Sequence, residues 1–349
     1  MKTLERAALA DDVPGRLVSG PVGALIGDPT MQVVAVTTSK DPNPKALLLL
    51  MEPGATEPSI VVKVPLTDIA EAAVAAEACV LAGVHHLLPP DLARTIPRVL
   101  TMVDLQGRRA MVATAVPGTP MSRMYRRWHH TAHPHAVRVD FLATQRWLAR
   151  LQTATAVGHR LFDPDSGTLA KLADRFEGEA GLAVSLDRLA HIHSLLRGVD
   201  CIESAVHGDL WWGNLLMANR EITGAVDWEA ATLRGCPVRD VARFAVSYAL
   251  YLDRQTRPGR RVPGQPGLRA SWGAGVTYAL NGTGWFPELF QSFVRRGLER
   301  AGMPPGLWRP LVLAALADAA AGADHRGFAS QHLALFDRLA TPDVGTPWH

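Results

Sequence analysis

The sequence predicts an α+β protein in which a small antiparallel-sheet lobe is followed by a larger, mostly helical lobe. Three observations predict this class. Short runs rich in β-branched residues are concentrated before residue 116, apolar residues recur at helical spacing after residue 134, and a segment rich in Pro and Gly, residues 116–120, separates the two regions. We therefore expect an N-terminal lobe at residues 1–116 and a C-terminal lobe at residues 117–349.

The elements of the first lobe follow from short apolar runs and one capped helix. Thr67 and Asp68 form an N-cap signal, and the Ala-rich stretch after them is expected to form a helix that Gly83 ends. Short turns join the first three runs, so an antiparallel meander is the simplest arrangement. Residues 1–30 are expected as a short helix or coil. The strands are expected at residues 32–38, 46–51, 59–64, 98–104 and 109–115.

The second lobe is predicted from apolar residues at helical spacing. Pro237 suits the first turn of one of its helices. Residues 202–228 are expected as short strands and turns, and residues 254–269, which are rich in Pro, Gly and Arg, as a loop. The helices are expected at residues 135–156, 168–179, 185–197, 237–251, 287–302, 307–323 and 328–339.

The composition narrows the class of protein. The 349 residues are 48% apolar and 20% charged, which is enough apolar material for a sizeable core. The net charge of +3 and the lack of a long Lys/Arg run argue against a nucleic-acid partner. No apolar run approaches the roughly 18 residues of a membrane span, and the N-terminus is not a secretory signal. Three cysteines without a C-x-x-C pair favour reduced thiols, so we expect a cytoplasmic protein whose oligomeric state stays open.

Chemically capable side chains are concentrated in residues 206–214 and 222–229. Asp209 can accept a proton from a hydroxyl group, and Asn214 and Asp227 can hold a hard divalent cation. A single loop Asp is often only a turn former, but the three together form the set that phosphoryl transfer from a nucleotide requires. The sequence therefore predicts a nucleotide- and Mg²⁺-dependent phosphoryl-transfer site.

The spacing of these residues follows the protein-kinase pattern with two departures. His-x-Asp-x-x-x-x-Asn is kept, but Gly208 replaces the Arg, and Asp227 is followed by Trp and Glu where D-F-G would stand. His207 is a poor Mg²⁺ ligand, and no second His or Cys is placed for zinc, so we expect a structural role for it. Only nine residues separate Asp227 from Pro237, too few for a protein-kinase activation segment.

The segment at residues 206–245 resembles the aminoglycoside phosphotransferase / choline kinase-like family of small-molecule kinases, whose fold is related to that of protein kinases. The resemblance implies a bilobal protein kinase-like fold and the cofactors Mg²⁺ and ATP or GTP. It implies that Asp209 is the catalytic aspartate, that Asn214 and Asp227 bind Mg²⁺, and that Asp240 braces the catalytic loop. An Asp in the first turn of a helix is also favourable through the helix dipole alone, so that alternative stays open for Asp240.

The first lobe offers a cation for the nucleotide phosphates. Lys63 lies near the end of an apolar strand, where a kinase-like site needs a rigidly held Lys, although a Lys facing solvent at a strand edge stays an alternative. Glu77 and Glu71 are candidates to pair with it. Glu77 is preferred, because a charge among Ala and Val in the middle of a helix needs a partner.

Two further segments of the first lobe are expected to contact the nucleotide. The loop at residues 37–45 lacks G-x-G-x-x-G, but its tight turn and the Ser39 hydroxyl are candidates for binding phosphate oxygens. The stretch from Thr114 to Val116 is expected to offer backbone groups to the adenine edge.

The acceptor is the least defined part of the prediction. Trp211, Trp212 and Trp228 flank the catalytic segments and are candidates to line an acceptor pocket, although scattered aromatic residues often pack the core instead. We predict an enzyme that transfers the γ-phosphoryl group of ATP or GTP to a hydroxyl group of an antibiotic, nucleoside, sugar or amino alcohol. A role in antibiotic resistance is implied only by the resemblance. A nucleotide-binding pseudokinase that acts as a scaffold or regulator is the alternative.

Overall fold

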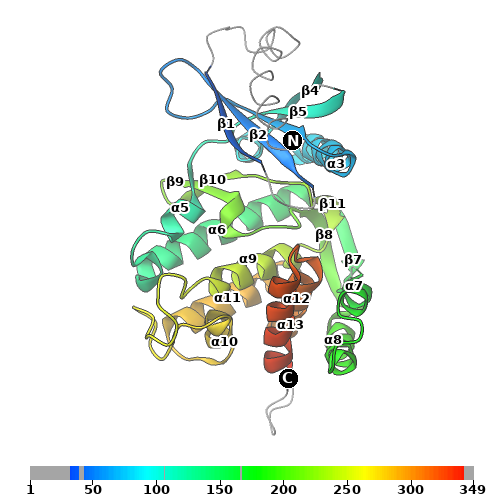
Figure 1. The fold of residues 1–349 in the computed structure, drawn as a ribbon, viewed down its shortest axis with the longest axis vertical. Helices are drawn as coiled ribbons and strands as arrows, with labels where there is room; N and C mark the ends of the chain where they lie inside the picture. Colours follow the sequence, from blue (N-terminus) through cyan, green and yellow to red (C-terminus); the bar gives the residue numbers. More distant parts are fainter. Residues whose placement is uncertain (1–31, 39–42, 106, 166, 342–349) are drawn as a thin grey trace. The chain divides into compact units, whose positions relative to one another are not determined.

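The computed structural model describes residues 32–38, 43–105, 107–165 and 167–341, which form two compact units. The first unit contains the described residues up to Gly118 together with residues 216–218 and 222–231, and the second contains the rest. The first is built on an antiparallel sheet and the second mainly on helices, so the predicted α+β class is confirmed (Figure 1). The expected lobes at 1–116 and 117–349 stay a prediction. The expectation for residues 1–30 lies outside the described residues.

The first unit is organised around a five-stranded sheet in the order β1-β2-β3-β5-β4. Every neighbouring pair is antiparallel. All five strands were predicted, each to within one residue at either end. Their bounds are β1 (Gln32–Thr38), β2 (Lys45–Met51), β3 (Ile60–Pro65), β4 (Val99–Leu105) and β5 (Arg108–Thr114).

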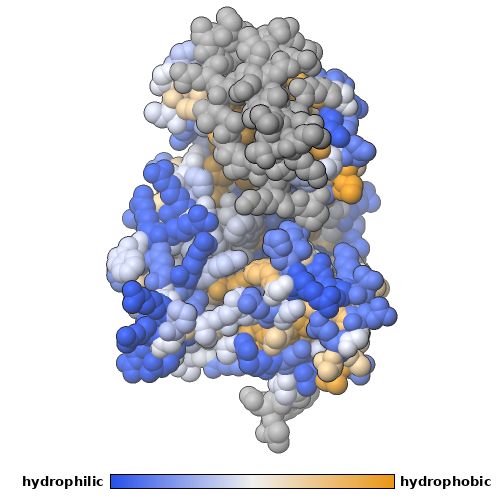
Figure 2. Space-filling model, viewed as in Figure 1, coloured by the Kyte–Doolittle hydropathy of each residue, from blue (hydrophilic) through white to orange (hydrophobic). Residues whose placement is uncertain are grey.

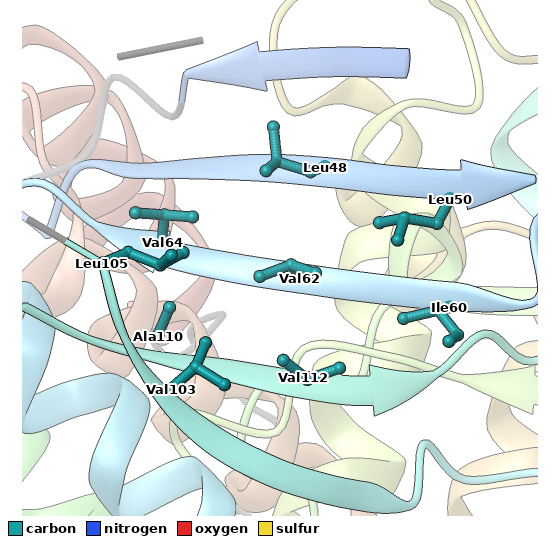
Figure 3. Packing of buried hydrophobic residues seen from close by; sticks show 9 residues of the cluster. All are labelled: Leu48, Leu50, Ile60, Val62, Val64, Val103, Leu105, Ala110 and Val112. Atoms are coloured by element: carbon teal, nitrogen blue, oxygen red, sulfur yellow. The ribbon is translucent and has the colours of Figure 1, made fainter. Parts of the chain in front are cut away.

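One face of this sheet carries an apolar cluster (Figure 3). Val62 lies opposite Leu48 on β2 and opposite Val112 on β5, so the three side chains meet across neighbouring strands. Because successive side chains of a strand alternate between faces, Lys63 projects from the other face of the sheet. The sheet pairing therefore separates the core from the charged residue.

Helix α3 (Asp68–Leu87) begins where predicted but does not end at Gly83. Thr67 caps it, because its Oγ1 accepts a hydrogen bond from the Ala70 N–H at 3.2 Å. Leu81 and Val84 on either side of Gly83 are fully buried, and this packing outweighs the roughly 1 kcal/mol penalty of a helical glycine. Among the described helices, α3 alone has the length and composition of a membrane span, but six of its side chains are buried within the protein.

A later stretch of the chain completes the first unit. It consists of most of β9 (Leu215–Ala218) and β10 (Glu221–Ala225), with the residues that follow up to position 231. The Ala225 N–H donates to the Thr95 carbonyl oxygen at 2.8 Å, just after the short helix α4 (Pro90–Ala93). The Thr223 hydroxyl donates to the Pro117 carbonyl oxygen, also at 2.8 Å. These bonds fix the strand that leads directly to Asp227.

The second unit combines helices with a three-stranded antiparallel sheet in the order β11-β8-β7. Its strands are β7 (Gly158–Leu161), β8 (Asp200–Val206) and β11 (Thr232–Gly235), and a two-residue strand, β6 (Thr119–Pro120), precedes its first helix. Its helices are α5 (Met121–Tyr125), α6 (Pro134–Thr155), α7 (Thr168–Arg175), α8 (Leu182–Leu196), α9 (Val238–Leu250), α10 (Ala274–Asn281), α11 (Trp285–Arg300), α12 (Trp308–Gly322) and α13 (Arg326–Ala340). Short 3-10 turns occupy His130–Ala132, Trp212–Asn214 and Pro305–Leu307.

All seven predicted helices of this unit are present, but the sequence missed α5 and α10. In α10, Gly275 and Thr277 weaken the helical signal. A Cβ atom on Gly275 would lie 2.0 Å from the Ala249 carbonyl oxygen, so the glycine is needed for close packing on α9. Helix α7 ends four residues earlier than predicted, because Gly178 turns the chain with a φ of 78°.

Helix α9 is the centre of the second unit. It contacts α10, α11 and α12, and within α9, all of which is described, only Arg239 and Arg243 are not buried. Its Phe244 ring packs edge-on against Phe141 of α6, with ring centroids 5.3 Å apart. On the face shown in Figure 2, the exposed apolar residues of this unit form patches among hydrophilic residues. A helix held on nearly every side provides a rigid base for the residues it presents.

We predict that Leu50→Ala destabilises the protein by about 2–5 kcal/mol, because the fully buried side chain belongs to the sheet cluster and its removal leaves a cavity. Ile69→Ala is the matched control in the same unit, since Ile69 is 69% exposed, and it is expected to change stability by about 0.5 kcal/mol or less. Chemical denaturation measures both. Equal effects would contradict the assignment of this core.

Stability should fall in mild acid because of His193 on α8. Burial lowers the pKa of His193, against the opposing effect of nearby carboxylates such as Asp165, and neither ring nitrogen has a hydrogen-bond partner among the described residues. The unfolded state therefore takes up a proton first as the pH drops below about 6.5, which lowers the free energy of unfolding by up to about 1.4 kcal/mol per pH unit. His193→Leu should reduce this slope between about pH 6.5 and 5 in denaturation measurements, and an unchanged slope would contradict the prediction.

Candidate active site

The second unit holds a loop that begins where β8 ends. Gly208 has a φ of 83°, in the left-handed region that favours glycine, so the chain turns sharply just before Asp209. The Asp240 carboxylate on α9 accepts two backbone hydrogen bonds from this loop. Its Oδ2 accepts from the His207 N–H at 2.7 Å, and its Oδ1 accepts from the Gly208 N–H at 2.9 Å. The Asp240 side chain therefore holds the N–H groups of both His207 and Gly208.

Asp240 is buried, and this burial raises the pKa of its carboxyl group, whereas His207 and the two backbone N–H donors act to lower it. Asp240 does lie in the first turn of α9, as the helix-dipole alternative requires. However, both of its oxygens are used by the loop. The contact expected of a bracing residue is thus present, and the functional role of Asp240 stays a prediction.

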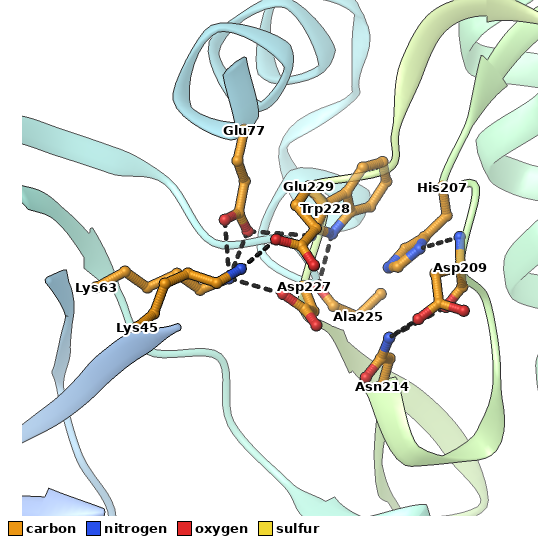
Figure 4. A network of polar contacts seen from close by, with 10 residues as sticks. All are labelled: Lys45, Lys63, Glu77, His207, Asp209, Asn214, Ala225, Asp227, Trp228 and Glu229. Carbon is orange, nitrogen blue, oxygen red and sulfur yellow. Dashed lines mark hydrogen bonds and ion pairs between the residues drawn. The ribbon is translucent and has the colours of Figure 1, made fainter. Parts of the chain in front are cut away.

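Asp209 is held by two different partners in this unit. The Arg243 guanidinium donates through Nε to Asp209 Oδ1 at 2.9 Å, and its Nη2 lies 2.8 Å from the same oxygen. The Asn214 amide donates through Nδ2 to the Asp209 carbonyl oxygen at 3.0 Å and lies 3.4 Å from Oδ2 (Figure 4). The sequence did not single out Arg243, because an Arg one turn after a helical Asp gives no distinctive signal.

His207 has the surroundings of a structural residue. Its side chain is fully buried, and its Nδ1 accepts the Asp209 N–H at 3.4 Å (Figure 4). A ring nitrogen that accepts a backbone hydrogen bond is not available to a metal ion. This geometry supports the structural role expected for His207.

The first unit holds a second cluster, centred on Lys63 (Figure 4). Lys63 Nζ lies 2.7 and 2.8 Å from the two oxygens of Glu77 on α3 and 3.0 Å from Asp227 Oδ1. Burial by itself lowers the pKa of Lys63, but the carboxylates of Glu77 and Asp227 outweigh this effect and raise the pKa above its usual value. Lys63 is therefore a permanent cation that projects from a rigid strand, which excludes the alternative of a solvent-facing Lys.

The structure separates the two glutamate candidates on α3. Glu71 accepts the Arg109 N–H through Oε1 at 3.1 Å and lies 3.7 Å from Nη1 of Arg108. Glu77 is 1% exposed and binds Lys63. Glu77 is thus the partner, as its position among apolar residues indicated.

Asp227 stands on a constrained turn. Its φ of 69° lies in the left-handed region, which a non-glycine residue rarely adopts. The next backbone N–H, that of Trp228, donates to Glu77 Oε1 at 3.0 Å and so holds the turn against α3. Lys45 and Glu229 add an ion pair beside it that the sequence did not predict (Figure 4).

The tryptophan assignments need a correction. Trp212 and Trp228 are fully buried, and their indole N–H groups donate to carbonyl oxygens, that of Trp212 to Ser247 and that of Trp228 to Ala225. They are core residues, because a fully buried ring presents no surface to a ligand. Trp211 is half-buried and remains the candidate for an acceptor contact.

The expected adenine and phosphate contacts are less defined. Ser39 lies outside the described residues. The Thr114 N–H donates to the Arg98 carbonyl oxygen and the Ala115 N–H to the Ser59 carbonyl oxygen, each at 2.9 Å, so these amides are used within the first unit. The adenine contact expected from Thr114 and Val116 stays a prediction.

The residues expected to bind Mg²⁺ offer suitable oxygens in each unit. Asn214 uses its Nδ2 to hold Asp209, so its carboxamide oxygen is the atom that remains for a cation. Asp227 contributes a carboxylate that is 39% exposed. Among the described residues, no group of three His, Cys, Asp or Glu side chains could hold a metal ion. A cation bound by either residue would therefore take further ligands from nucleotide phosphates and water, as Mg²⁺ commonly does.

Comparison with known families gives one match, which covers residues 52–272. The matching family is the phosphotransferase enzyme family. The match includes Lys63, Glu77, Asp209, Asn214, Asp227 and Asp240. No curated protein matches the chain.

Solved structures of antibiotic phosphotransferases share the fold at low sequence identity. A thermostable mutant of aminoglycoside phosphotransferase APH(4)-Ia, in complex with ADP and hygromycin B, has a TM-score of 0.56 and 16% identity, with 93% of this chain and 98% of that chain covered. A streptomycin–ATP complex of APH(2")-IIa has a TM-score of 0.53 and 13% identity, with 90% of this chain and 94% of that chain covered. Macrolide 2'-phosphotransferase MphH from Brachybacterium faecium has a TM-score of 0.51 and 17% identity, with 89% of this chain and 93% of that chain covered.

We predict that Glu77→Gln weakens the binding of Mg²⁺–ATP about tenfold, equivalent to about 1.4 kcal/mol. Without a charged Glu77, Asp227 would be the one carboxylate paired with Lys63. Lys63 would then compete with the cation for Asp227. Titration calorimetry measures the affinity. Glu71→Gln is the control on the same helix and should change affinity less than about twofold, and an equal loss in both variants would contradict the assignment.

Proposed function

Because the chain belongs to the phosphotransferase enzyme family, we propose that it transfers the γ-phosphoryl group of ATP to a hydroxyl group of a small molecule. The observation that carries this proposal is Asp209. Asn214 binds its carbonyl oxygen, Arg243 binds its side chain, and Asp240 holds the two residues before it. The Asp209 side chain is nevertheless 34% exposed and accessible to a substrate. A rigid, accessible carboxylate suits a group that orients a hydroxyl and takes its proton.

The reaction proceeds by in-line displacement at the γ-phosphorus. The acceptor oxygen forms a bond to phosphorus, the bond to the β–γ bridging oxygen breaks, and ADP leaves with that oxygen. Asp209 receives the proton of the acceptor hydroxyl. Lys63, fixed by Glu77, binds the α- and β-phosphate oxygens, and its raised pKa keeps it charged throughout the working range of pH.

Mg²⁺ fits the oxygen donors of Asn214 and Asp227, and when bound it would neutralise charge on the phosphates. In the structure the exposed Asp227 carboxylate contacts Lys63. Binding of the cation and phosphates would exchange this contact for one between Lys63 and phosphate oxygens. The protein thus presents the charged Lys63 side chain and the accessible Asp227 carboxylate to the incoming nucleotide.

The acceptor we propose is an antibiotic, with nucleosides, sugars and amino alcohols as further candidates. The structures with a similar fold include enzymes named for aminoglycosides and for macrolides, which supports a test of both classes. The ATP and ADP complexes among them favour ATP over GTP as the donor. A role in resistance within the cytoplasm would follow from an antibiotic acceptor.

The proposal is tested by measuring Mg²⁺-dependent consumption of ATP, and of GTP, with a panel of hydroxylated antibiotics and metabolites. Asp209→Ala should lower kcat by about 10²–10⁴-fold for the stimulating acceptor and leave ATP affinity nearly unchanged, since the side chain acts on the acceptor hydroxyl. Asp187→Ala, at an exposed position of α8, is the control and should retain kcat.

Turnover that survives Asp209→Ala would contradict the assigned role of this carboxylate. If ATP binds but no member of the panel stimulates turnover, a scaffolding pseudokinase becomes the better account.

A further inference from the structure

Helix α9 presents two arginines outside its buried surface, four residues apart, and they have different partners. Arg239 donates to the carbonyl oxygens of Asp163 and Pro164 and lies 3.8 Å from Asp318. Arg243 donates through Nε to Oδ1 of Asp209 and forms an ion pair with it through Nη2. We propose that Arg243 is a positioning residue for phosphoryl transfer: it fixes Oδ1 of Asp209, so that Oδ2 is the oxygen that receives the acceptor proton. This inference rests on the proposed function.

The support of Arg243 makes such positioning possible. Its neighbours Ala242 and Phe244 are buried, and α9 is packed by three other helices, so the base of the side chain is fixed. Asp240 lies three residues before Arg243, which places both side chains on one face of the helix. One turn of α9 therefore holds the backbone of His207 and Gly208 through Asp240 and the side chain of the next residue, Asp209, through Arg243.

The two oxygens of Asp209 are not equivalent. Oδ1 accepts a charge-assisted hydrogen bond from Arg243 Nε at 2.9 Å and lies 2.8 Å from Nη2, so the guanidinium engages this oxygen. In the described part of the helical unit, the one polar contact of Oδ2 is with Asn214 Nδ2 at 3.4 Å, a length at which a hydrogen bond is weak. The hydroxyl group of the substrate therefore donates its hydrogen bond to Oδ2 of Asp209.

Arg243 does not touch the acceptor in this account and acts through Asp209. During transfer the acceptor O–H bond breaks, its proton moves to Asp209 Oδ2, and the acceptor oxygen bonds to the γ-phosphorus while ADP leaves. Without the guanidinium, the Asp209 side chain would rotate among several positions. A displacement of a catalytic group by about 1 Å costs on the order of a hundredfold in rate.

The kinetic test compares Arg243→Met and Arg243→Lys with Arg239→Met, a matched control on the same helix. Turnover of ATP is measured with the acceptor found by the panel and with water alone. Arg243→Met should lower kcat about 10–100-fold with KM for ATP within about twofold of wild type. Arg243→Lys should recover part of kcat, because the charge is kept while the planar guanidinium, which meets Oδ1 with two nitrogens, is lost. Arg239→Met should keep kcat within about threefold.

Chemical rescue separates positioning from a structural role. Guanidinium chloride at low millimolar concentration should raise kcat of Arg243→Ala several-fold, whereas sodium chloride at equal ionic strength should not. The proposal is overturned if Arg243→Met keeps kcat within about threefold of wild type. It is overturned equally if turnover and ATP affinity fall together and guanidinium restores neither.

The contact itself can be tested without any turnover. In ¹⁵N NMR spectra of arginine side chains, the Nε–H signal of Arg243 is identified by its loss in Arg243→Lys. Asp209→Asn should shift that signal, because the acceptor oxygen becomes part of a neutral amide. An unmoved signal overturns the proposal even if the enzyme is active. A moved signal in a protein that consumes no ATP would refute the proposed function and leave the contact standing.

Discussion

The buried contact between Asp240 and the loop after β8 is the interaction on which the rest of the candidate site depends. One carboxylate satisfies the N–H groups of His207 and Gly208, and so fixes the left-handed turn that presents Asp209. The contact is rigid because α9 is buried on nearly every side. A buried carboxylate without these donors would be costly, which couples the turn to the packing of the whole helical unit.

A second constraint acts in the first unit, where Lys63 contacts two carboxylates. Lys63 is bound by both oxygens of Glu77 and by one of Asp227, and Glu77 also accepts the Trp228 N–H. The pair with Glu77 is buried, whereas Asp227 is partly exposed. The two carboxylates that hold Lys63 thus differ in exposure, and we propose that the exposed one, Asp227, is the partner that a cation and a nucleotide replace.

The sequence predicted those parts of the protein that leave a local signal. A charged Glu77 among apolar helical residues indicated a partner, and Lys63 near the end of an apolar strand was the candidate to pair with it. Other features depend on tertiary packing. Helix α3 continues past Gly83 because its flanks are buried, and Trp212 and Trp228 are fully buried. Arg243 could not be found, because nothing in the sequence shows which carboxylate a helical arginine will meet.

We propose that the γ-phosphoryl group of ATP passes to a hydroxyl on the acceptor. The decisive measurement uses ATP whose γ-phosphoryl group carries ¹⁸O at its non-bridging oxygens, in ordinary water, with products analysed by mass spectrometry and ³¹P NMR. Such transfer yields an acceptor phosphate ester that retains all three labelled oxygens, formed about 10²–10⁴-fold more slowly with Asp209→Ala. Label found only in inorganic phosphate, with the acceptor recovered unmodified, would contradict it.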